Sequence, residues 1–216
     1  MKLQWLGHAC FKITHKGYSV VIDPYNSRYV DGYPKLKVKA DKLLVSHEHY
    51  GHNYREGVIL SGKPESECPF NIESFEVAHD GVYGHMRGNC LVHILEADGL
   101  RVAHMGDIGA PLNGGEAGQL FGVDALMVCA GSLRALPAEA VYRMTDELFP
   151  KAIIPMHYHD GVRGYKRLET IDDFTKHFDS PEMIQHYTTD TIEIDADTEP
   201  QVAVLKYLGG RNGDFT

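Results

Sequence analysis

Three histidines in one short polar segment have the clearest potential for chemistry. His47, His49 and His52 stand in the stretch SHEHYGHNY, residues 46–54, with the spacing H-x-H-x-x-H. Imidazole binds zinc and other first-row transition metals, and this spacing on a loop is typical of a metal site. Because the chain has 13 histidines, the motif alone is moderate evidence and needs support from elsewhere in the sequence.

Further potential metal ligands occur singly at other points of the chain. His79 follows the run ESFEVA, Asp107 lies in HMGDIG, and His157 follows KAIIPM. Taken alone, a histidine after a strand is more often a surface or capping residue. Each of these residues, however, follows an apolar run and is flanked by Gly, Asp or Pro, and this shared context favours one common site.

The first half of the chain consists mainly of short strand-like runs separated by turn residues. Asp98 and Gly99 supply a turn that accepts positive φ, so the runs on either side of them predict a hairpin. The predicted strands of this half span residues 2–6, 10–13, 19–23, 42–46, 73–78, 89–97 and 101–105.

The second half alternates strand-like and helix-like segments. The first predicted helix has Pro137 near its first turn and Pro150 at its end, and the second opens with capping-box spacing between Thr170 and Asp173. The helices span 136–150 and 170–178, and the strands span 123–130, 151–156, 190–195 and 201–208. This order favours an α/β (α+β) protein whose sheets are covered by outer helices.

The candidate ligands share a position on this map, because each follows a predicted strand. Strand ends that gather at one edge of a sheet can direct side chains from distant parts of the chain at one point. Imidazoles and a carboxylate brought together in this way would suit one or two divalent ions. The candidate metal ligands are His47, His49, His52, His79, Asp107 and His157.

Composition narrows the classes of partner. The 216 residues suffice for one sizeable core, so a single domain over residues 1–216 is expected. A net charge of −9 argues against nucleic-acid or anionic-membrane partners, because phosphate binding needs a basic field. No apolar run has the length of a signal peptide or a membrane span. The four cysteines are scattered without a C-x-x-C pair, which favours reduced thiols and a cytoplasmic location.

Six segments together resemble the metallo-β-lactamase-fold hydrolases. The segments are WLGHACFKI, VIDPY, SHEHYGHN, HMGDIG, DALMVCAGS and IIPMHY, and they follow the order of that family. The resemblance covers nearly the whole chain and extends to a small bacterial branch that includes ascorbate-phosphate lactonase-like proteins. It implies a four-layer αββα sandwich with two central sheets.

The resemblance also implies a ligand set and a reaction. His47, His49 and His79 would hold the first ion, His52 and His157 the second, and Asp107 would bridge the two. The ions would be Zn²⁺ or another divalent transition metal such as Mn, Fe or Ni. In such sites a metal-bound hydroxide attacks a small-molecule ester, lactone, amide or phosphodiester. Asp107, His157 and Tyr158 are the catalytic candidates, and Tyr158 would donate a hydrogen bond to an oxyanion.

Gly51 departs from the family pattern, which has an aspartate at this position. Glycine offers no ligand, so the second ion would bind more weakly with water in the gap, or another side chain would complete its ligand set. His8, His159 and His104 are the candidates for that role. On the first interpretation, Gly51→Asp should tighten the second ion; on the other, the substitution would crowd the site.

Three further features have more than one interpretation. Asp23 either orients a ligand histidine or caps the turn before Pro24, and Arg87 either clamps an anionic substrate or pairs with a surface carboxylate. The tyrosine-rich segment 25–37 is too polar for core and is expected to form a wall over the site, or to cover the site of a neighbour in a homo-oligomer.

Two other functions compete with hydrolysis. The redox enzymes of the fold resemble H-x-E-x-D, and His49 in place of that glutamate disfavours redox chemistry. A protein that binds a metal or ligand without turnover remains the alternative, because Gly51 removes a carboxylate from the motif.

Overall fold

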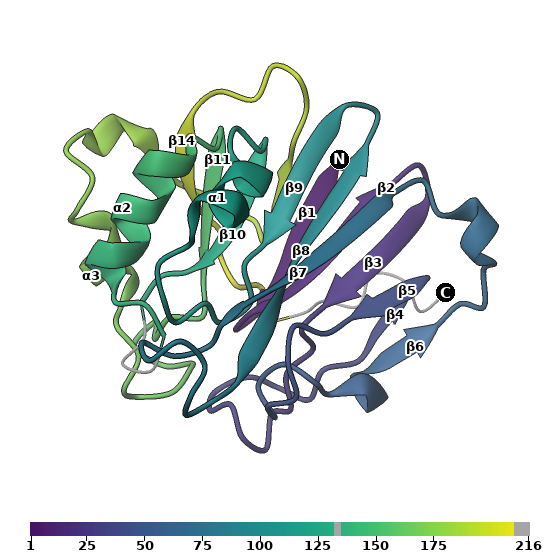
Figure 1. The fold of residues 1–216 in the computed structure, drawn as a ribbon. Coiled ribbons are helices and arrows are strands. Elements are labelled where there is room, and N and C mark those ends of the chain that lie inside the picture. Colours follow the sequence, from purple (N-terminus) through teal and green to yellow (C-terminus); the bar gives the residue numbers. More distant parts are fainter. Residues whose placement is uncertain (132–134, 210–216) are drawn as a thin grey trace.

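The computed structural model describes residues 1–131 and 135–209, so Ser132, the last residue of the motif DALMVCAGS, lies outside the described residues. Two large β-sheets face each other, and α-helices cover one outer side (Figure 1). The predicted α/β sandwich is therefore confirmed. Within the described part of the chain, no helix is long and apolar enough to cross a bilayer.

The strands of the described residues fall into three sheets. The five-stranded sheet has the order β13 (Thr191–Glu193), β1 (Lys2–Gly7), β2 (Cys10–His15), β3 (Tyr18–Ile22) and β5 (Lys42–Leu44). The seven-stranded sheet has the order β12 (Ile184–His186), β14 (Gln201–Val204), β11 (Ala152–Met156), β10 (Ala125–Cys129), β9 (Leu100–His104), β8 (Asn89–Ala97) and β7 (Asn71–Ala78). The small sheet pairs β4 (Val38–Ala40) with β6 (Val58–Leu60).

The main apolar core lies between the two large sheets. Phe11 and Ile13 of β2 are fully buried and alternate with more polar residues, which places one face of that strand in the core. Val92 and Ile94 of β8 are buried in the same core, within residues 92–95, which are buried on both faces of the strand. Burial of each of these side chains contributes about 1.5–3 kcal/mol, so the core holds the strand ends in fixed positions.

The helix predicted over 136–150 is confirmed as α2 (Ala138–Leu148), which lies outside the seven-stranded sheet (Figure 1). Pro137 occupies its N-cap, and Phe149 ends it in a left-handed conformation with φ +52°. Its apolar stripe, which includes Val141 and Leu148, is buried. These contacts place α2 on the outer side of β10.

The other two helices differ from expectation. The predicted capping box between Thr170 and Asp173 is present, but α3 covers only Ile171–Thr175 because the chain folds back and Phe178 packs on Phe174. An additional helix, α1 (Gly114–Leu120), begins at an Asn113–Glu116 capping box. Single-turn 3₁₀ segments occur at η1 (Arg55–Gly57), η2 (Glu65–Glu67) and η3 (Pro181–Met183).

The outer side of the five-stranded sheet is covered by a second apolar cluster. This corrects the expectation that segment 25–37 is too polar for core, because Tyr25 is 1% exposed and Tyr33 is 5% exposed. Their rings pack with centroids 5.0 Å apart. Tyrosine can bury its apolar ring, and for that reason a tyrosine-rich segment can form core. Other residues of the same segment face the candidate site described below.

The predicted hairpin is confirmed between β8 and β9, where Asp98 and Gly99 have φ values of +52° and +78°. It matters for the site because β9 then runs parallel to β10, and β10 runs parallel to β11. Parallel strands end at the same edge of a sheet. The residues that follow β9, β10 and β11 are thereby brought together.

Candidate metal centre

The strand ends meet at one edge of the sandwich, and the predicted ligands lie there. Potential ligand atoms of His47, His49 and His79 lie within 4.8 Å of one another, although these residues follow two different strands, β5 and β7. A second triad with the same spacing consists of His8, His52 and His157. These two sets are called the first and second histidine triads below.

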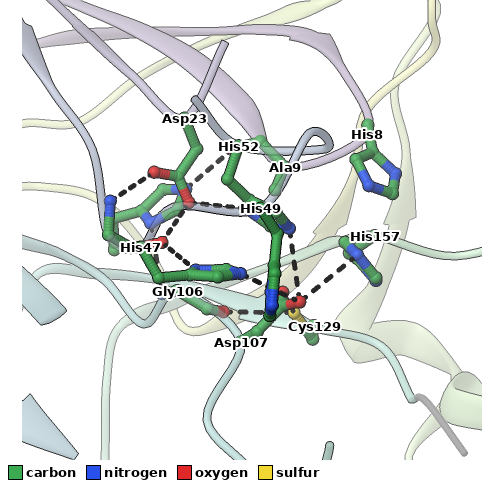
Figure 2. Close-up of polar contacts among 12 residues, drawn as sticks. His8, Ala9, Asp23, His47, His49, His52, Gly106, Asp107, Cys129 and His157 are labelled. Atoms are coloured by element: carbon green, nitrogen blue, oxygen red, sulfur yellow. Dashed lines mark hydrogen bonds and ion pairs between the residues drawn. The ribbon is translucent and has the colours of Figure 1, made fainter. Parts of the chain in front are cut away.

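Asp107 lies between the two triads. Its Oδ2 atom is 3.2 Å from His52 Nε2 and 3.6 Å from His157 Nε2, and it is 3.8 Å from His47 Nε2 in the first triad (Figure 2). The structure thus places the predicted bridging carboxylate where it reaches histidines of both triads. The other oxygen, Oδ1, accepts a hydrogen bond from Cys129 Sγ at 3.2 Å.

Hydrogen bonds to the Nδ1 atoms fix which nitrogen each histidine presents. His52 Nδ1 donates to Asp23 Oδ2 at 2.8 Å, and His79 Nδ1 donates to the carbonyl oxygen of Asp107 at 2.7 Å. Ser46 Oγ donates to Asp23 Oδ2 and accepts from His47 Nδ1. In this network Nε2 is the nitrogen that each of the three histidines turns toward its neighbours in the site: Asp107 for His47 and His52, and His49 for His79. Ligand histidines in metal sites are oriented in the same way.

Asp23 holds this network together from a fully buried position. It also accepts the backbone N–H of Ser46 at 2.6 Å, because β3 and β5 are parallel neighbours and end side by side. The structure places Asp23 against a histidine of the site, so Asp23 orients a candidate ligand, which is the first of the two interpretations given for this residue. The carboxylate therefore orients His52 directly and His47 through Ser46.

Electrostatics favour neutral imidazoles at most positions. Burial lowers the pKa of His47 to about 3 and that of His157 to about 4, and burial also lowers the pKa of His49. Burial opposes the charged form of His52 too, but Asp107 and Asp23 together raise its pKa to about 10. Two buried carboxylates thus attract a positive charge to His52, and a divalent cation would satisfy the same field.

Asp107 remains ionised in these surroundings. Burial raises its pKa, but the imidazoles of His157 and His52 outweigh burial and hold the pKa well below its usual range. An anionic carboxylate between two sets of imidazoles is a suitable donor set for divalent transition metals, once a bound ion takes the place of the proton on His52.

Unpaired nitrogens support the same interpretation. Within the described residues, the buried atoms without a hydrogen-bond partner include both ring nitrogens of His8, Nε2 of His47 and Nδ1 of His157. Buried polar atoms are nearly always paired in folded proteins. Several unpaired imidazole nitrogens in one buried cluster therefore fit a metal ion, and the residues of the two triads suit such an ion.

Two histidines named from the sequence are used differently. His104 is fully buried, with Nε2 against the carbonyl oxygen of Ala9 at 2.8 Å and Nδ1 accepting from Gly106 N at 3.2 Å. His159 Nδ1 accepts from Gly161 N at 3.1 Å. Neither belongs to a ligand cluster among the described residues. Both nitrogens of His104 are engaged, so this residue holds the backbone that leads to Asp107.

Tyr158 does not face the site. Its buried ring stacks on Trp5 with centroids 5.4 Å apart, and it lines a separate depression with His159. The left-handed backbone of His157, with φ +56°, reverses the chain between these neighbours. Tyr165, which sequence reasoning missed, lines the site instead.

A cavity of about 710 Å³ opens over the triads. Asp107, His49, His52 and His157 form part of its wall, and the stacked rings of Tyr29 and Tyr50, 4.1 Å apart, form another part. Tyr29 and Asp31 come from segment 25–37, so part of this segment does border the site as expected. Three cationic side chains line the same cavity, namely Arg87, Lys166 and Arg167.

Comparison with known proteins supports what the geometry indicates. A family model described as the beta-lactamase superfamily domain matches residues 2–157. The chain belongs to the β-lactamase superfamily. The resemblance inferred from the motifs is thereby confirmed, and residues 2–157 include His8, Asp107 and all the histidines of the two triads.

Relatives and solved structures of the superfamily cover most of the chain. A UPF0173 protein of Pyrococcus abyssi is 29% identical over 195 residues, which are 77% of this chain and 90% of the relative. A UPF0173 metal-dependent hydrolase of Pyrobaculum neutrophilum is 24% identical over 191 residues, 74% of this chain and 84% of the relative. The expectation of a bacterial branch stays a prediction, because such relatives are mostly archaeal.

A crystal structure from Thermotoga maritima superposes with a TM-score of 0.67 at 26% identity, covering 94% of this chain and 97% of that one. That protein is described as a candidate Zn-dependent hydrolase of the metallo-β-lactamase superfamily. This superposition covers both large sheets, including the strands that follow residue 157.

Proposed function

We propose that this protein is a metal-dependent hydrolase that cleaves an ester, lactone, amide or phosphodiester bond in a small molecule. The observation that carries the proposal is the position of Asp107 Oδ2, between 3.2 and 3.8 Å from Nε2 atoms of both triads. Imidazole-rich sets with a shared carboxylate suit zinc first and Mn, Fe or Ni as alternatives. The names of the relatives support the same class of reaction.

The side chains of this site have separable tasks. Divalent ions, when bound, would supply a water nucleophile at neutral pH and polarise the bond that breaks. Asp23 and Ser46 fix the orientation of the ligand imidazoles, and Cys129 holds Oδ1 of Asp107 so that Oδ2 points at the triads. Because most of these side chains are buried and held by hydrogen bonds, the site needs little reorganisation during the reaction.

Tyr165 is the proposed hydrogen-bond donor to the substrate. It lines the cavity beside His157, and burial raises its pKa, so the phenol stays protonated at neutral pH. This gives Tyr165 the role that the sequence suggested for Tyr158. A protonated donor next to the ligand cluster is suited to an oxyanion that forms when an acyl or phosphoryl bond is attacked.

The substrate proposed for the cavity is a small anion. Arg87, Lys166 and Arg167 line it, and the structure shows no ion pair for any of them among the described residues. In a chain of net charge −9, cations gathered at one cavity focus a local positive field. The volume of about 710 Å³ suits a metabolite-sized molecule, which is consistent with the expectation of no nucleic-acid and no membrane partner.

Metal content measured together with hydrolysis tests the proposal. Protein stripped with a chelator should be inactive on a panel of anionic esters, lactones, amides and phosphodiesters, and Zn²⁺ or Mn²⁺ should restore activity. Asp107→Ala, purified in parallel, controls for contaminating hydrolases. Metal-replete protein that is inert across the panel would favour the alternative, a non-catalytic metal- or ligand-binding protein, which the loss of a carboxylate at Gly51 makes the second candidate.

Two other expectations remain proposals. A cytoplasmic location is consistent with the four free cysteines of the structure. A homo-oligomer is proposed because Tyr29 and Tyr50, 47% and 59% exposed, form a flat aromatic surface beside the cavity. Light scattering at working concentration tests this, and a monomer would remove it.

A further inference from the structure

The space beside Gly51 is already occupied. A Cβ atom built on Gly51 would lie 3.0 Å from His8 Nε2 and 3.3 Å from the Tyr165 hydroxyl. Gly51 has no left-handed φ, so its backbone conformation does not explain the glycine. The close approach of the His8 imidazole does explain it, because a Cβ atom at position 51 would require that ring to shift by a few tenths of an ångström, and a longer side chain would crowd it further.

His8 reaches this place through an unusual backbone. It follows Gly7, whose φ is +109°, and itself has a φ of +53°, which is rare for a residue with a Cβ. Its carbonyl oxygen accepts hydrogen bonds from Trp5 Nε1 at 2.9 Å and from the backbone N–H of His157 at 3.0 Å. Strained conformations of this kind persist where the surroundings enforce them, and they cluster at functional sites.

The ring of His8 is directed into the second triad. It is fully buried, its centroid lies 4.0 Å from that of His157 and 5.5 Å from that of His52, and neither of its nitrogens has a hydrogen-bond partner among the described residues (Figure 2). A histidine that served only to fill the core would be expected to pair at least one nitrogen. Potential ligand atoms of the three rings lie within 4.8 Å of one another.

We propose that His8 is a metal ligand that takes the place of the missing carboxylate, so that the second ion is held by His8, His52, His157 and Asp107. This rests on the metal-dependent function proposed above and changes the chemistry of one of its two ion positions. Three imidazoles and one carboxylate can complete a tetrahedral set. Because a neutral imidazole replaces an anion, the second ion should be a nitrogen-preferring metal such as Zn²⁺ or Co²⁺ in preference to Mn²⁺.

The central test uses variants chosen for the backbone. His8→Asn keeps a residue that tolerates positive φ, whereas Ala would add strain. Apo-protein titrated with Zn²⁺ against a chromophoric chelator should show two ions for the parent chain. In His8→Asn the second ion should bind at least about tenfold more weakly, which is the loss found when even an indirect partner of a ligand is removed. His159→Ala is the matched control and should bind as the parent does.

Variants that move the ligand from position 8 to position 51 give a more specific test. Gly51→Asp alone should weaken the second ion, because the new side chain meets His8 Nε2. The double variant His8→Gly/Gly51→Asp removes the imidazole, restores a carboxylate, and should regain most of the affinity. Co²⁺ absorption provides a second readout, because a four-coordinate Co²⁺ ion absorbs far more strongly than one whose coordination expands to five or six as water enters. Circular dichroism of each apo-variant confirms folding.

The outcomes separate this inference from the proposed function. If His8→Asn binds two ions as tightly as the parent, or Gly51→Asp alone tightens the second ion, His8 is not a ligand, although the enzyme assignment stands. If the parent binds no metal, both fail. If the metal pattern is as expected but hydrolysis is absent from every metal-replete form, His8 stands as a ligand and the hydrolase proposal falls.

Discussion

Asp23 Oδ2 lies 2.8 Å from His52 Nδ1, and both side chains are fully or almost fully buried. The two residues are 29 positions apart in sequence and meet because β3 and β5 end side by side. The contact places the proton of His52 on Nδ1 and leaves Nε2 facing Asp107. The orientation of this histidine is therefore determined by the sheet before any ion binds.

We expect Asp23→Asn to weaken metal binding without removing a ligand. The amide is similar in size but lacks the charge that polarises His52, and either of its orientations disturbs the bonds to Ser46 and His52. Loss of such a partner typically costs ten- to a hundredfold in affinity. Competition with a chelator measures the change. Affinity equal to that of the parent chain would show that Asp23 is a structural cap only.

His49→Ala should remove most of the first ion from the purified protein. His49 Nδ1 lies 3.1 Å from His79 Nε2, and both rings belong to the first triad. Removal of one of three imidazoles leaves too few donors for tight binding. Elemental analysis gives the stoichiometry, with the exposed His186→Ala on β12 as a control for the loss of a histidine. Unchanged metal content in His49→Ala would remove the first-site assignment.

The limits of sequence reasoning are clearest at these residues. Strand ends, the β8–β9 hairpin and α2 follow from local patterns of apolar residues, proline and Asp-Gly, and they were predictable. The contact between His8 and Gly51 depends on how two distant turns pack, so no local pattern reports it. The apolar run around Cys129 predicts a core residue, and Cys129 is buried. Only the structure shows its hydrogen bond to Asp107.

Some other features that the sequence analysis did not predict had a visible pattern in the sequence, and the rest had none for a physical reason. The Asn113–Glu116 spacing that caps α1 was visible in the sequence. The three-residue strands β4, β6 and β12 are too short to show a period. Tyr158 stands next to a candidate ligand in sequence but packs on Trp5, and the left-handed backbone of His157 between the two directions has no signal in the sequence.

Tyr165→Phe should lower kcat by about tenfold or more while metal content stays the same. The hydroxyl is the only group removed, and loss of one oxyanion donor costs on the order of a hundredfold in well-studied sites. Tyr158→Phe is the matched control, because that ring is buried against Trp5 outside the cavity. Equal kcat for Tyr165→Phe and the parent would exclude Tyr165 as a donor to the reacting atoms.

Arg87→Ala should raise KM for anionic substrates and change kcat little. Asp80 holds this arginine in place, since its carboxylate accepts the backbone N–H groups of Val82, Gly84, Met86 and Arg87. The increase in KM should shrink at high salt, where exposed charges are screened. Arg143→Ala, on the surface of α2, should leave KM unchanged. A KM for Arg87→Ala that is unchanged at low salt would contradict a substrate-binding role.

The free energy of unfolding should fall as the pH falls below about 6.5. His93 and His104 face each other across β8 and β9, and burial lowers the pKa of both. In the unfolded chain these histidines titrate near the ordinary pKa of about 6.5. Below that pH the unfolded chain therefore binds protons that the folded chain does not bind. The stabilisation is complete above pH 6.5 and is lost toward the lowered folded pKa values. Each histidine contributes at most one proton to the difference between the two states, which adds at most about 1.4 kcal/mol per pH unit to the slope of the unfolding free energy against pH.

His93→Gln isolates one of these protons. Its Nδ1 lies 2.7 Å from Ser74 Oγ, and glutamine can keep a hydrogen bond there while losing the titration. Urea unfolding of the apo-protein at several pH values between 4 and 7 should give a shallower slope for this variant than for the parent, by up to about 1.4 kcal/mol per pH unit. The exposed His186→Ala should leave the slope unchanged. Parallel slopes for parent and His93→Gln would mean that His93 is protonated in the folded protein and that its burial does not oppose charging.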